Sequence, residues 1–233
     1  MTEKSAGADH STNPERGRPA ARLSRLYLDA LRANDAAGAY RVTSRAIAGG
    51  MPVPVLYQQV ITPAMHAIGE LWERGAITVA DEHLATALTH RVLGALRSPI
   101  RCEVHVDAPG ERSPQGRAML ATVEGEQHAL GLRMVADVLE DLGFHAIYLG
   151  ADVPTEALLQ ALDSLSPDLL ALSVTMPHLS RTLEEVASEV RHSHPHLDLL
   201  VGGQAAPAEG VCGERETAVQ DLELLSRDLV RQP

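Results

Sequence analysis

The sequence has few aromatic residues: they make up 3% of its 233 residues, whereas 45% are hydrophobic. Alanine, leucine and valine must therefore build most of the core. Side chains of this kind pack well between helices, and between helices and strands that are buried on both faces. The composition thus favours helical and α/β architectures.

Positive charge, cysteine and long apolar runs are also scarce. The net charge of −11 argues against a duplex-binding surface, which needs clustered lysine and arginine. Cys102 and Cys212 alone do not make a disulfide framework. Residues 1–20 hold no apolar stretch typical of a signal peptide, and no run approaches transmembrane length. We therefore expect a cytoplasmic protein that contacts neither a membrane nor DNA directly.

The first half of the chain is predicted to be helical. Residues 1–20 are rich in small, polar and charged residues and are expected to form a disordered tail. Apolar residues then recur at three-to-four spacing through residues 21–100. The helices are expected near residues 23–31, over 35–48, from Pro54 to about 75 with a bend at Pro63, and after a Thr78–Asp81 capping box. Short loops between four helices predict a four-helix bundle.

The second half alternates between strand and helix patterns. Residues 101–117 are turn-rich and are interpreted as a linker to a domain over residues 118–233. Continuous apolar runs predict buried parallel strands at 118–123, 146–149, 168–174 and 197–201, with helices near 128–142, 154–164 and 179–192. The fold class is therefore all-α plus α/β, with a Rossmann-like, doubly wound parallel sheet. The region after Gly203 looks too short for a further helix and a fifth strand.

A histidine motif follows the first predicted strand. The loop lacks the dinucleotide fingerprint and reads Glu126-Gln127-His128, with Gly131 three residues later. Histidine is a common metal ligand, and Glu126 can accept its other ring N–H and so fix its tautomer. From these residues alone, a helix-capping histidine beside a solvated glutamate is an equally good interpretation.

Small residues end the third and fourth predicted strands. Ser173 and Thr175 close the third, and Gly202-Gly203 closes the fourth. Ligands of doubly wound sheets bind at the carboxyl ends of the strands. Small residues at two adjacent strand ends are expected to open a slot for a flat or elongated group.

Together these motifs resemble the cobalamin-binding fold of methionine synthase, corrinoid methyl carriers and B12-type photoreceptors. That family carries Asp (or Glu)-x-His-x-x-Gly, then Ser-x-Leu (or Thr), then Gly-Gly after the first, third and fourth strands. The resemblance covers roughly residues 21–205. It implies that the nucleotide tail of cobalamin lies in the slot, bounded by Glu126, Gln127, Gly131, Ser173, Thr175, Gly202 and Gly203. It also implies that His128 replaces this tail as the lower axial ligand of cobalt.

The helical half resembles one branch of the family. Trp72 is followed, after nine residues, by Glu82-His83, which is similar to a signature of the photoreceptors related to CarH. The resemblance implies that these three residues line the upper face of adenosylcobalamin and receive its adenosyl group. The alternative from the residues alone is that Trp72 fills the core of the bundle and Glu82 is solvated.

One position departs from that signature. Photoreceptors that form a second cobalt–histidine bond in light have histidine directly after the tryptophan, where this chain has Glu73. Carboxylate is a harder ligand that does not reproduce a pair of imidazoles. His66, His83 and His90 are alternatives among which the sequence does not choose. The change is compatible with a bilin such as biliverdin as a second chromophore, as in photocobilin-type proteins.

The leading hypothesis is a light-sensing protein that is not itself an enzyme. About twenty residues precede the helical region, too few for a helix-turn-helix domain, so we expect a sensory module that forms a homo-oligomer and signals to an unidentified protein partner. A corrinoid carrier of a methyltransferase system is the alternative. A third hypothesis is a domain of this fold that has lost cobalamin and binds haem or another tetrapyrrole.

Overall fold

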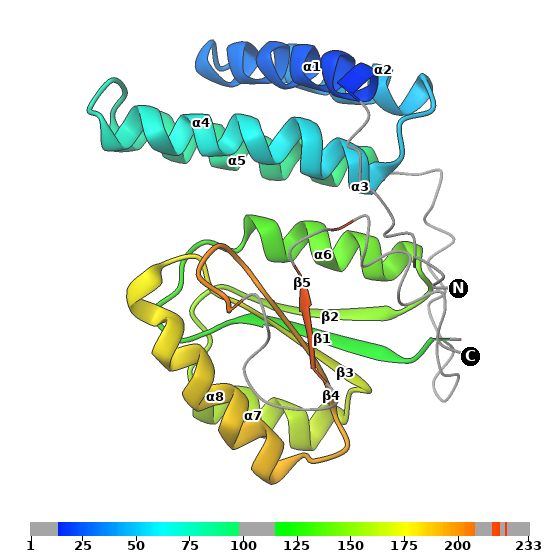
Figure 1. Cartoon of the computed structure of the whole chain (residues 1–233), viewed down its shortest axis with the longest axis vertical. Coiled ribbons are helices and arrows are strands. Elements are labelled where there is room, and N and C mark those ends of the chain that lie inside the picture. The colour runs from blue at the N-terminus through cyan, green and yellow to red at the C-terminus, as the bar shows by residue number, and fades with distance from the viewer. Residues whose placement is uncertain (1–13, 98–114, 208–215, 220–221, 223–233) are drawn as a thin grey trace, which may run out of the picture.

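The N-terminal part of the described chain is helical (Figure 1). The computed structural model describes residues 14–97, 115–207, 216–219 and 222. The first of these ranges holds α1 (Pro14–Arg32), α2 (Ala36–Ala48), α3 (Val53–Leu56), the π-helical segment η1 (Tyr57–Ile61), α4 (Thr62–Glu73) and α5 (Val79–Arg97). Apart from the start of α1, these helices follow the predicted segments closely.

Helix α1 begins earlier than expected. Residues 14–20 were assigned to a disordered tail, but α1 starts at Pro14, and Ala20 is only 3% exposed. Proline is well tolerated in a first helical turn. Ala20 extends the buried stripe of Tyr27 and Leu31, so tertiary packing overrides the polar composition. Residues 1–13 lie outside the described part of the chain.

The expected irregularity near Pro63 takes the form of η1. The Thr62 N–H bonds to the carbonyl of Tyr57, five residues earlier. Proline lacks an N–H, and its ring collides with the carbonyl four residues before it, which here belongs to Gln59. A widened π-turn accommodates that collision without ending the helix.

The predicted capping box of α5 is present. The backbone N–H of Asp81 donates to Thr78 Oγ1 at 3.2 Å, and the backbone N–H of Thr78 donates to Asp81 Oδ2 at 2.9 Å. Two backbone donors at the helix start thereby gain side-chain acceptors. This cap sets the point at which the chain turns back after α4.

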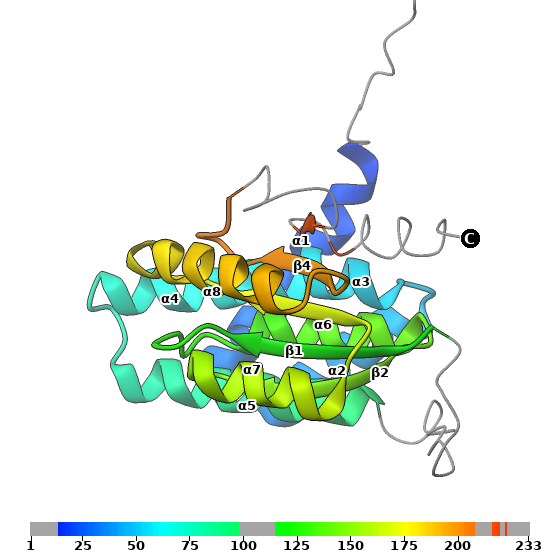
Figure 2. The same cartoon turned by 90° about the horizontal axis from the view of Figure 1, so that it is seen from below.

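The C-terminal part is a parallel sheet with helices on both faces. Its strands are β1 (Arg117–Thr122), β2 (His145–Gly150), β3 (Leu169–Ser173), β4 (Asp198–Gly202) and β5 (Glu216–Val219), in the order β2-β1-β3-β4-β5. Every neighbouring pair is parallel. Figures 1 and 2 show α6 (Leu130–Asp141) on one face and α7 (Thr155–Leu165) and α8 (Ser180–Ser193) on the other; the short 3-10 helix η2 (Pro177–Leu179) precedes α8. The predicted doubly wound sheet is confirmed.

The fifth strand corrects the sequence-based expectation. Residues 216–219 pair with β4 in register from Leu199–Glu216 to Gly202–Val219. The segment Glu-Thr-Ala-Val is short and has no apolar run, so it lacks the signal that marks strands buried on both faces. Parallel pairing at a sheet edge depends on backbone groups, which the composition does not reveal.

Some predictions fall outside the described residues. The expected linker over 101–117 lies there except for its last residues, of which Arg117 already belongs to β1. Cys102 and Cys212 also lie there. Among the described residues, no helix is both long and apolar enough to cross a membrane.

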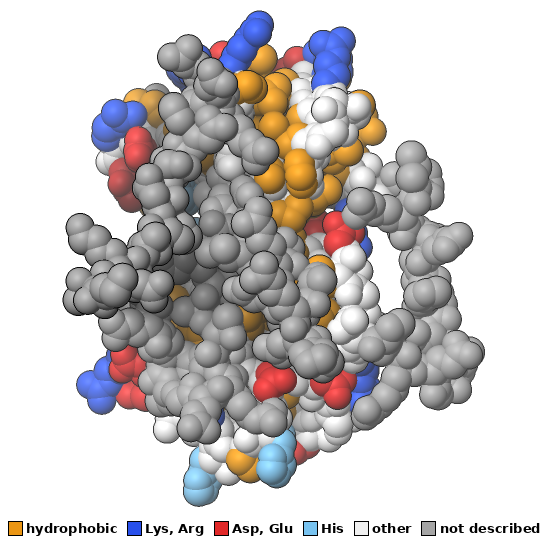
Figure 3. Space-filling view, turned by 45° about the vertical axis from the view of Figure 1, so that its right-hand side comes forward, with side chains coloured by type: hydrophobic (Ala, Val, Ile, Leu, Met, Phe, Trp, Pro, Cys, Tyr) orange, Lys and Arg blue, Asp and Glu red, His pale blue; other side chains and the backbone are white. Residues whose placement is uncertain are grey.

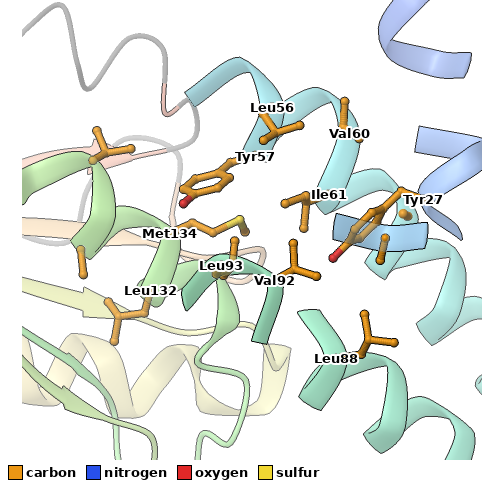
Figure 4. Packing of buried hydrophobic residues seen from close by; sticks show 14 of the residues in the cluster. Tyr27, Leu56, Tyr57, Val60, Ile61, Leu88, Val92, Leu93, Leu132 and Met134 are labelled. Carbon is orange, nitrogen blue, oxygen red and sulfur yellow. The ribbon is translucent and has the colours of Figure 1, made fainter. Parts of the chain in front are cut away.

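One continuous hydrophobic cluster joins the helical part to the sheet. Side chains of β1 alternate, so that Ala118 and Leu120 face the α6 side while Met119 and Ala121 pack with α7 and α8. The cluster on the α6 side continues into the N-terminal helices. Figure 4 shows Tyr57, Leu93 and Met134 together at this junction. The helical part therefore packs directly on α6.

A buried carboxylate on α6 adds polar contacts to this junction. Asp137, with 3% of its side chain exposed, accepts hydrogen bonds from Tyr57 Oη at 2.7 Å and from Arg97 Nη1 at 2.8 Å. Arg133 Nε lies 3.2 Å from the same carboxylate, and Glu140 pairs with Arg97. Burial, and next the charge of Asp137, raise the pKa of Tyr57 well above its usual value, so the phenol stays protonated and donates.

Replacing the phenol tests the strength of this junction. Tyr57→Phe removes one donor to a buried carboxylate without opening a cavity, and it should lower the free energy of unfolding by about 1–2 kcal/mol. Urea denaturation followed by circular dichroism measures the change. The matched control is Tyr40→Phe on α2, where the side chain is exposed and no change is expected. Equal stability of both variants would show that the Tyr57–Asp137 contact contributes nothing.

Candidate functional site

The histidine motif lies at the switch point of the sheet. The chain crosses from β1 to β2 on one side and later enters β3 on the other side of β1. The loops after β1 and β3 therefore separate at their carboxyl ends and leave a crevice, which is where doubly wound sheets bind ligands. Figures 1 and 2 show the turn between α4 and α5 at this same end of the molecule.

Glu126 joins the two loops of this crevice. It is completely buried, and both of its carboxylate oxygens are used. Oε1 accepts the backbone N–H of His128 at 2.9 Å and lies 2.6 Å from His128 Nδ1. Oε2 accepts the backbone N–H groups of Thr175 and Met176 at 2.7 and 2.9 Å. One carboxylate thus fixes both the histidine ring and the loop after β3.

The environment of Glu126 keeps it ionised. Burial by itself would raise the pKa of this carboxyl group, but the backbone N–H groups of His128, Met176 and Thr175 and the His128 ring together hold the pKa below its usual value. A buried carboxylate with four donors is a stable acceptor. It orients the imidazole and increases its basicity.

One nitrogen of the His128 ring is bound to Glu126, and the other is available. Its Nδ1 contacts Glu126, while 57% of the side chain is exposed, which leaves Nε2 available to a metal ion. The alternative of a capping histidine beside a solvated glutamate does not describe this loop. Helix α6 has Ala129 at its N-cap and no side-chain cap, and Glu126 is not solvated. The predicted contact between Glu126 and His128 is confirmed.

Two residues that sequence reasoning missed also hold this loop. Thr122 Oγ1 donates to the carbonyl of Glu126 at 2.6 Å. Asp152, after β2, accepts the backbone N–H of Gly125 at 2.7 Å and the side-chain amide of Gln127 at 2.9 Å. No motif marks either residue. The signal in the structure is the left-handed backbone of Asp152, with φ of 54°, which is uncommon outside glycine.

The small residues at the next two strand ends are adjacent in space. Ser173 is paired with Gly202 across β3 and β4 and is largely buried. Gly203 has φ of 103°, and a Cβ there would lie 2.1 Å from the carbonyl oxygen of Val174. Glycine is therefore required by the fold itself at position 203. Gly131 differs, because a Cβ at that position would meet no atom within 4 Å.

The residues expected above the site lie at the α4–α5 turn. Trp72, next to the end of α4, is 46% exposed, so it does not fill the core as the alternative required. Glu82 and His83 lie in the first turns of α5, with Glu82 Oε2 2.5 Å from His83 Nδ1. Glu82 Oε1 also accepts a hydrogen bond from Thr86. An exposed indole and an oriented acid–imidazole pair thus occupy the end of the molecule that holds His128.

One of the three alternative histidines contacts the sheet domain. His66, on α4, lies with its Nε2 2.5 Å from Nε2 of Gln204, the residue after Gly202-Gly203. His83 is paired with Glu82, and His90 projects from α5. Burial, followed by the charge of Arg133, lowers the pKa of His90. Glu73, at the end of α4, is exposed.

The donor set suits a cofactor that brings most of its own metal ligands. Within the described residues, no group of three or more histidine, cysteine, aspartate or glutamate side chains is placed to hold a bare metal ion. A corrin ring would bring four nitrogen ligands of its own, so the protein would have to supply only one more. A single imidazole with a buried carboxylate behind it meets that requirement.

Comparison with known families agrees with this site. A model of the B12 binding domain matches residues 116–223, and a second B12 binding domain model matches residues 23–97. The two matches cover the sheet domain and the helical part respectively. The chain therefore belongs to the cobalamin-binding proteins, and its domains indicate a corrinoid cofactor.

Its relatives include both repressors and corrinoid proteins. The chain is 32% identical to the HTH-type transcriptional repressor CarH of Myxococcus xanthus over 170 residues, which span 72% of this chain but 54% of CarH. It is 25% identical to trimethylamine corrinoid protein 1 of Methanosarcina acetivorans over 177 residues, covering 75% of this chain and 80% of that protein. The chain thus spans about half the length of CarH.

A solved structure shows the same fold. The monomethylamine corrinoid protein of Methanosarcina barkeri superposes with a TM-score of 0.69 at 18% sequence identity, covering 89% of this chain and 96% of that one. At this identity the likeness concerns the fold alone. It extends over the helical part and the sheet together.

Proposed function

We propose that the protein is a light sensor that holds adenosylcobalamin between its helical part and its sheet domain. The observation that carries this proposal is the position of Trp72. Its indole is 46% exposed, and it lies with Glu82-His83 at the end of the molecule where His128 offers a free nitrogen.

The lower side of the site provides the axial ligand. His128 Nε2 would bind cobalt while Glu126 holds Nδ1 and so sets the tautomer. Ser173, Thr175, Gly202 and Gly203 would border the nucleotide tail, together with Gln127. The open space around Gly131 supports this arrangement, because the fold itself does not require glycine there.

The upper side provides the light response. When bound, adenosylcobalamin supplies a cobalt–carbon bond that light breaks. Trp72 would cover the adenosyl group in darkness, with the Glu82–His83 pair beside it. Photolysis would remove that contact from Trp72 and from the Glu82–His83 pair, and the helical part would then be held less firmly over the sheet domain. A ligand shifts a conformational equilibrium only by its different affinity for the two states.

The output would be a change in self-association or in contact with a partner protein. Figure 3 shows hydrophobic side chains gathered at the surface of the helical part. Leu26, Tyr40, Val79 and Leu84 of this part are exposed. Exposed apolar side chains on the moving part suit a surface whose contacts depend on light. A bilin such as biliverdin as second chromophore is part of the proposal, because the presence of Glu73 where the related photoreceptors carry the histidine of a second cobalt bond is compatible with it.

Illumination tests the sensory function directly. The adenosylcobalamin complex should change its absorption spectrum and its elution volume in size-exclusion chromatography after green light. Trp72 is the only tryptophan of the chain, so quenching of its fluorescence on addition of adenosylcobalamin should report that the corrin lies close to its indole. The same titration with biliverdin tests the second chromophore. An unchanged spectrum, oligomeric state and emission would contradict the proposal.

Removing the proposed ligand tests the lower face. Adenosylcobinamide has no nucleotide base, so any nitrogen that binds its cobalt must come from the protein. Wild-type protein should shift its absorption to longer wavelength, whereas His128→Ala should leave the spectrum of free adenosylcobinamide unchanged. The control is His83→Ala, which leaves the lower face intact. A shift retained in His128→Ala would exclude this histidine, and haem binding in place of any corrinoid would support the third hypothesis.

A corrinoid carrier of a methyltransferase system is the second candidate. The similarity to trimethylamine corrinoid protein 1 and the fold shared with a monomethylamine corrinoid protein support it. A bulky indole above cobalt would hinder repeated methyl delivery, and for that reason we favour the sensor. Methylation of the bound cobalt(I) form by a partner methyltransferase, with no response to light, would reverse the choice.

A further inference from the structure

The loop that carries Glu126 and His128 is held from a third strand. Asp152 follows the end of β2, two residues after Gly150, and touches neither the His128 ring nor the Glu126 carboxylate. Its side chain contacts the residues on both sides of Glu126, and its backbone contacts Thr122 and the backbone of Glu126. It therefore acts on the site only through the loop.

All the polar groups of Asp152 that face the loop are used. Oδ1 accepts the backbone N–H of Gly125 at 2.7 Å, and Oδ2 accepts Nε2 of Gln127 at 2.9 Å. Its own backbone N–H donates to Thr122 Oγ1 at 2.8 Å and to the carbonyl of Glu126 at 2.9 Å. One residue thus holds the loop before, at and after the position of Glu126.

The backbone conformation is adapted to these contacts. Asp152 has φ of 54° and Gly125 has φ of 85°, both in the left-handed region. Aspartate tolerates this region better than most residues, since its short side chain bonds nearby backbone groups. Uncommon backbone conformations persist where surrounding contacts hold them in place. Here the hydrogen bond between Asp152 and Gly125 joins the two turns and holds both conformations.

We infer that Asp152 is a positioning residue for the axial histidine, an inference that rests on the proposed function. Glu126 orients His128 only while its own backbone is fixed, because a shift of the loop moves the carboxylate and the ring together. Asp152 and Thr122 provide that restraint from β2 and β1. Without Asp152, the loop would be less restrained, and the His128 imidazole would not be held in one orientation toward a bound cobalt ion.

The test compares Asp152→Ala with the conservative Asp152→Asn in the full chain. Asparagine keeps an oxygen that can accept the Gly125 N–H. The Asp152→Asn variant should therefore position the His128 ring nearly as well as wild type does. The matched control is Asp163→Ala on α7, whose exposed carboxylate contacts only His194 in the described structure. Thermal unfolding of the three apo variants checks that each remains folded.

Adenosylcobinamide titration in darkness gives the readout. Asp152→Ala should bind about tenfold more weakly, at the lower end of what residues behind a metal ligand contribute. At saturation it should retain a larger fraction of the base-off spectrum than wild type, which a general loss of stability would not produce. Asp152→Asn should resemble wild type, and Asp163→Ala should equal it.

Two outcomes would overturn the inference in distinguishable ways. If wild type shows the long-wavelength shift and Asp152→Ala shows the same shift and affinity, Asp152 does not position the histidine, and the proposed function stands. If wild type itself leaves the cobinamide spectrum unchanged, the axial role of His128 fails, and the role of Asp152 fails with it.

Discussion

The site depends on one buried carboxylate. Glu126 is completely enclosed, and its four donors come from the loop after β1 and from the loop after β3. A buried charge is stable only when it is fully paired, so this group restrains both loops at the switch point of the sheet. The orientation of His128, and with it any chemistry at the free nitrogen, follows from that restraint.

Helix α6 connects this restraint to the rest of the molecule. Its first residue comes two positions after His128, while Asp137, seven residues further along, holds Tyr57 and Arg97 of the helical part. Near the C-terminal end of α6, which carries Asp137, the junction is therefore buried and contains charged groups. At the other end, the contact between His66 and Gln204 is exposed. Under the proposed function, the helical part has a fixed contact at one end and a replaceable contact over the cofactor, which is the asymmetry that a switch requires.

Sequence patterns predicted the parts that depend on local chemistry. Apolar runs located β1 to β4, spacing located the capping box of Thr78 and Asp81, and the motif placed Glu126 against His128. The missing parts depend on contacts between distant segments. Asp137 meets a tyrosine 80 positions away, and Asp152 meets a loop about 25 positions away; both are ordinary aspartates in the sequence. The edge strand β5 was missed because backbone pairing with β4, rather than an apolar pattern, defines it.

The most direct test of the account is electron paramagnetic resonance of the cobalt(II) form of bound cobalamin, in protein labelled with 15N-histidine. The unpaired electron of cobalt(II) lies along the axial direction and couples to the axial nitrogen. Coordination by His128 predicts that the triplet splitting from a 14N ligand becomes a doublet in the labelled protein. A triplet that persists would show the cofactor's own base on cobalt, and an absence of nitrogen splitting would show no imidazole there; either result would contradict the account.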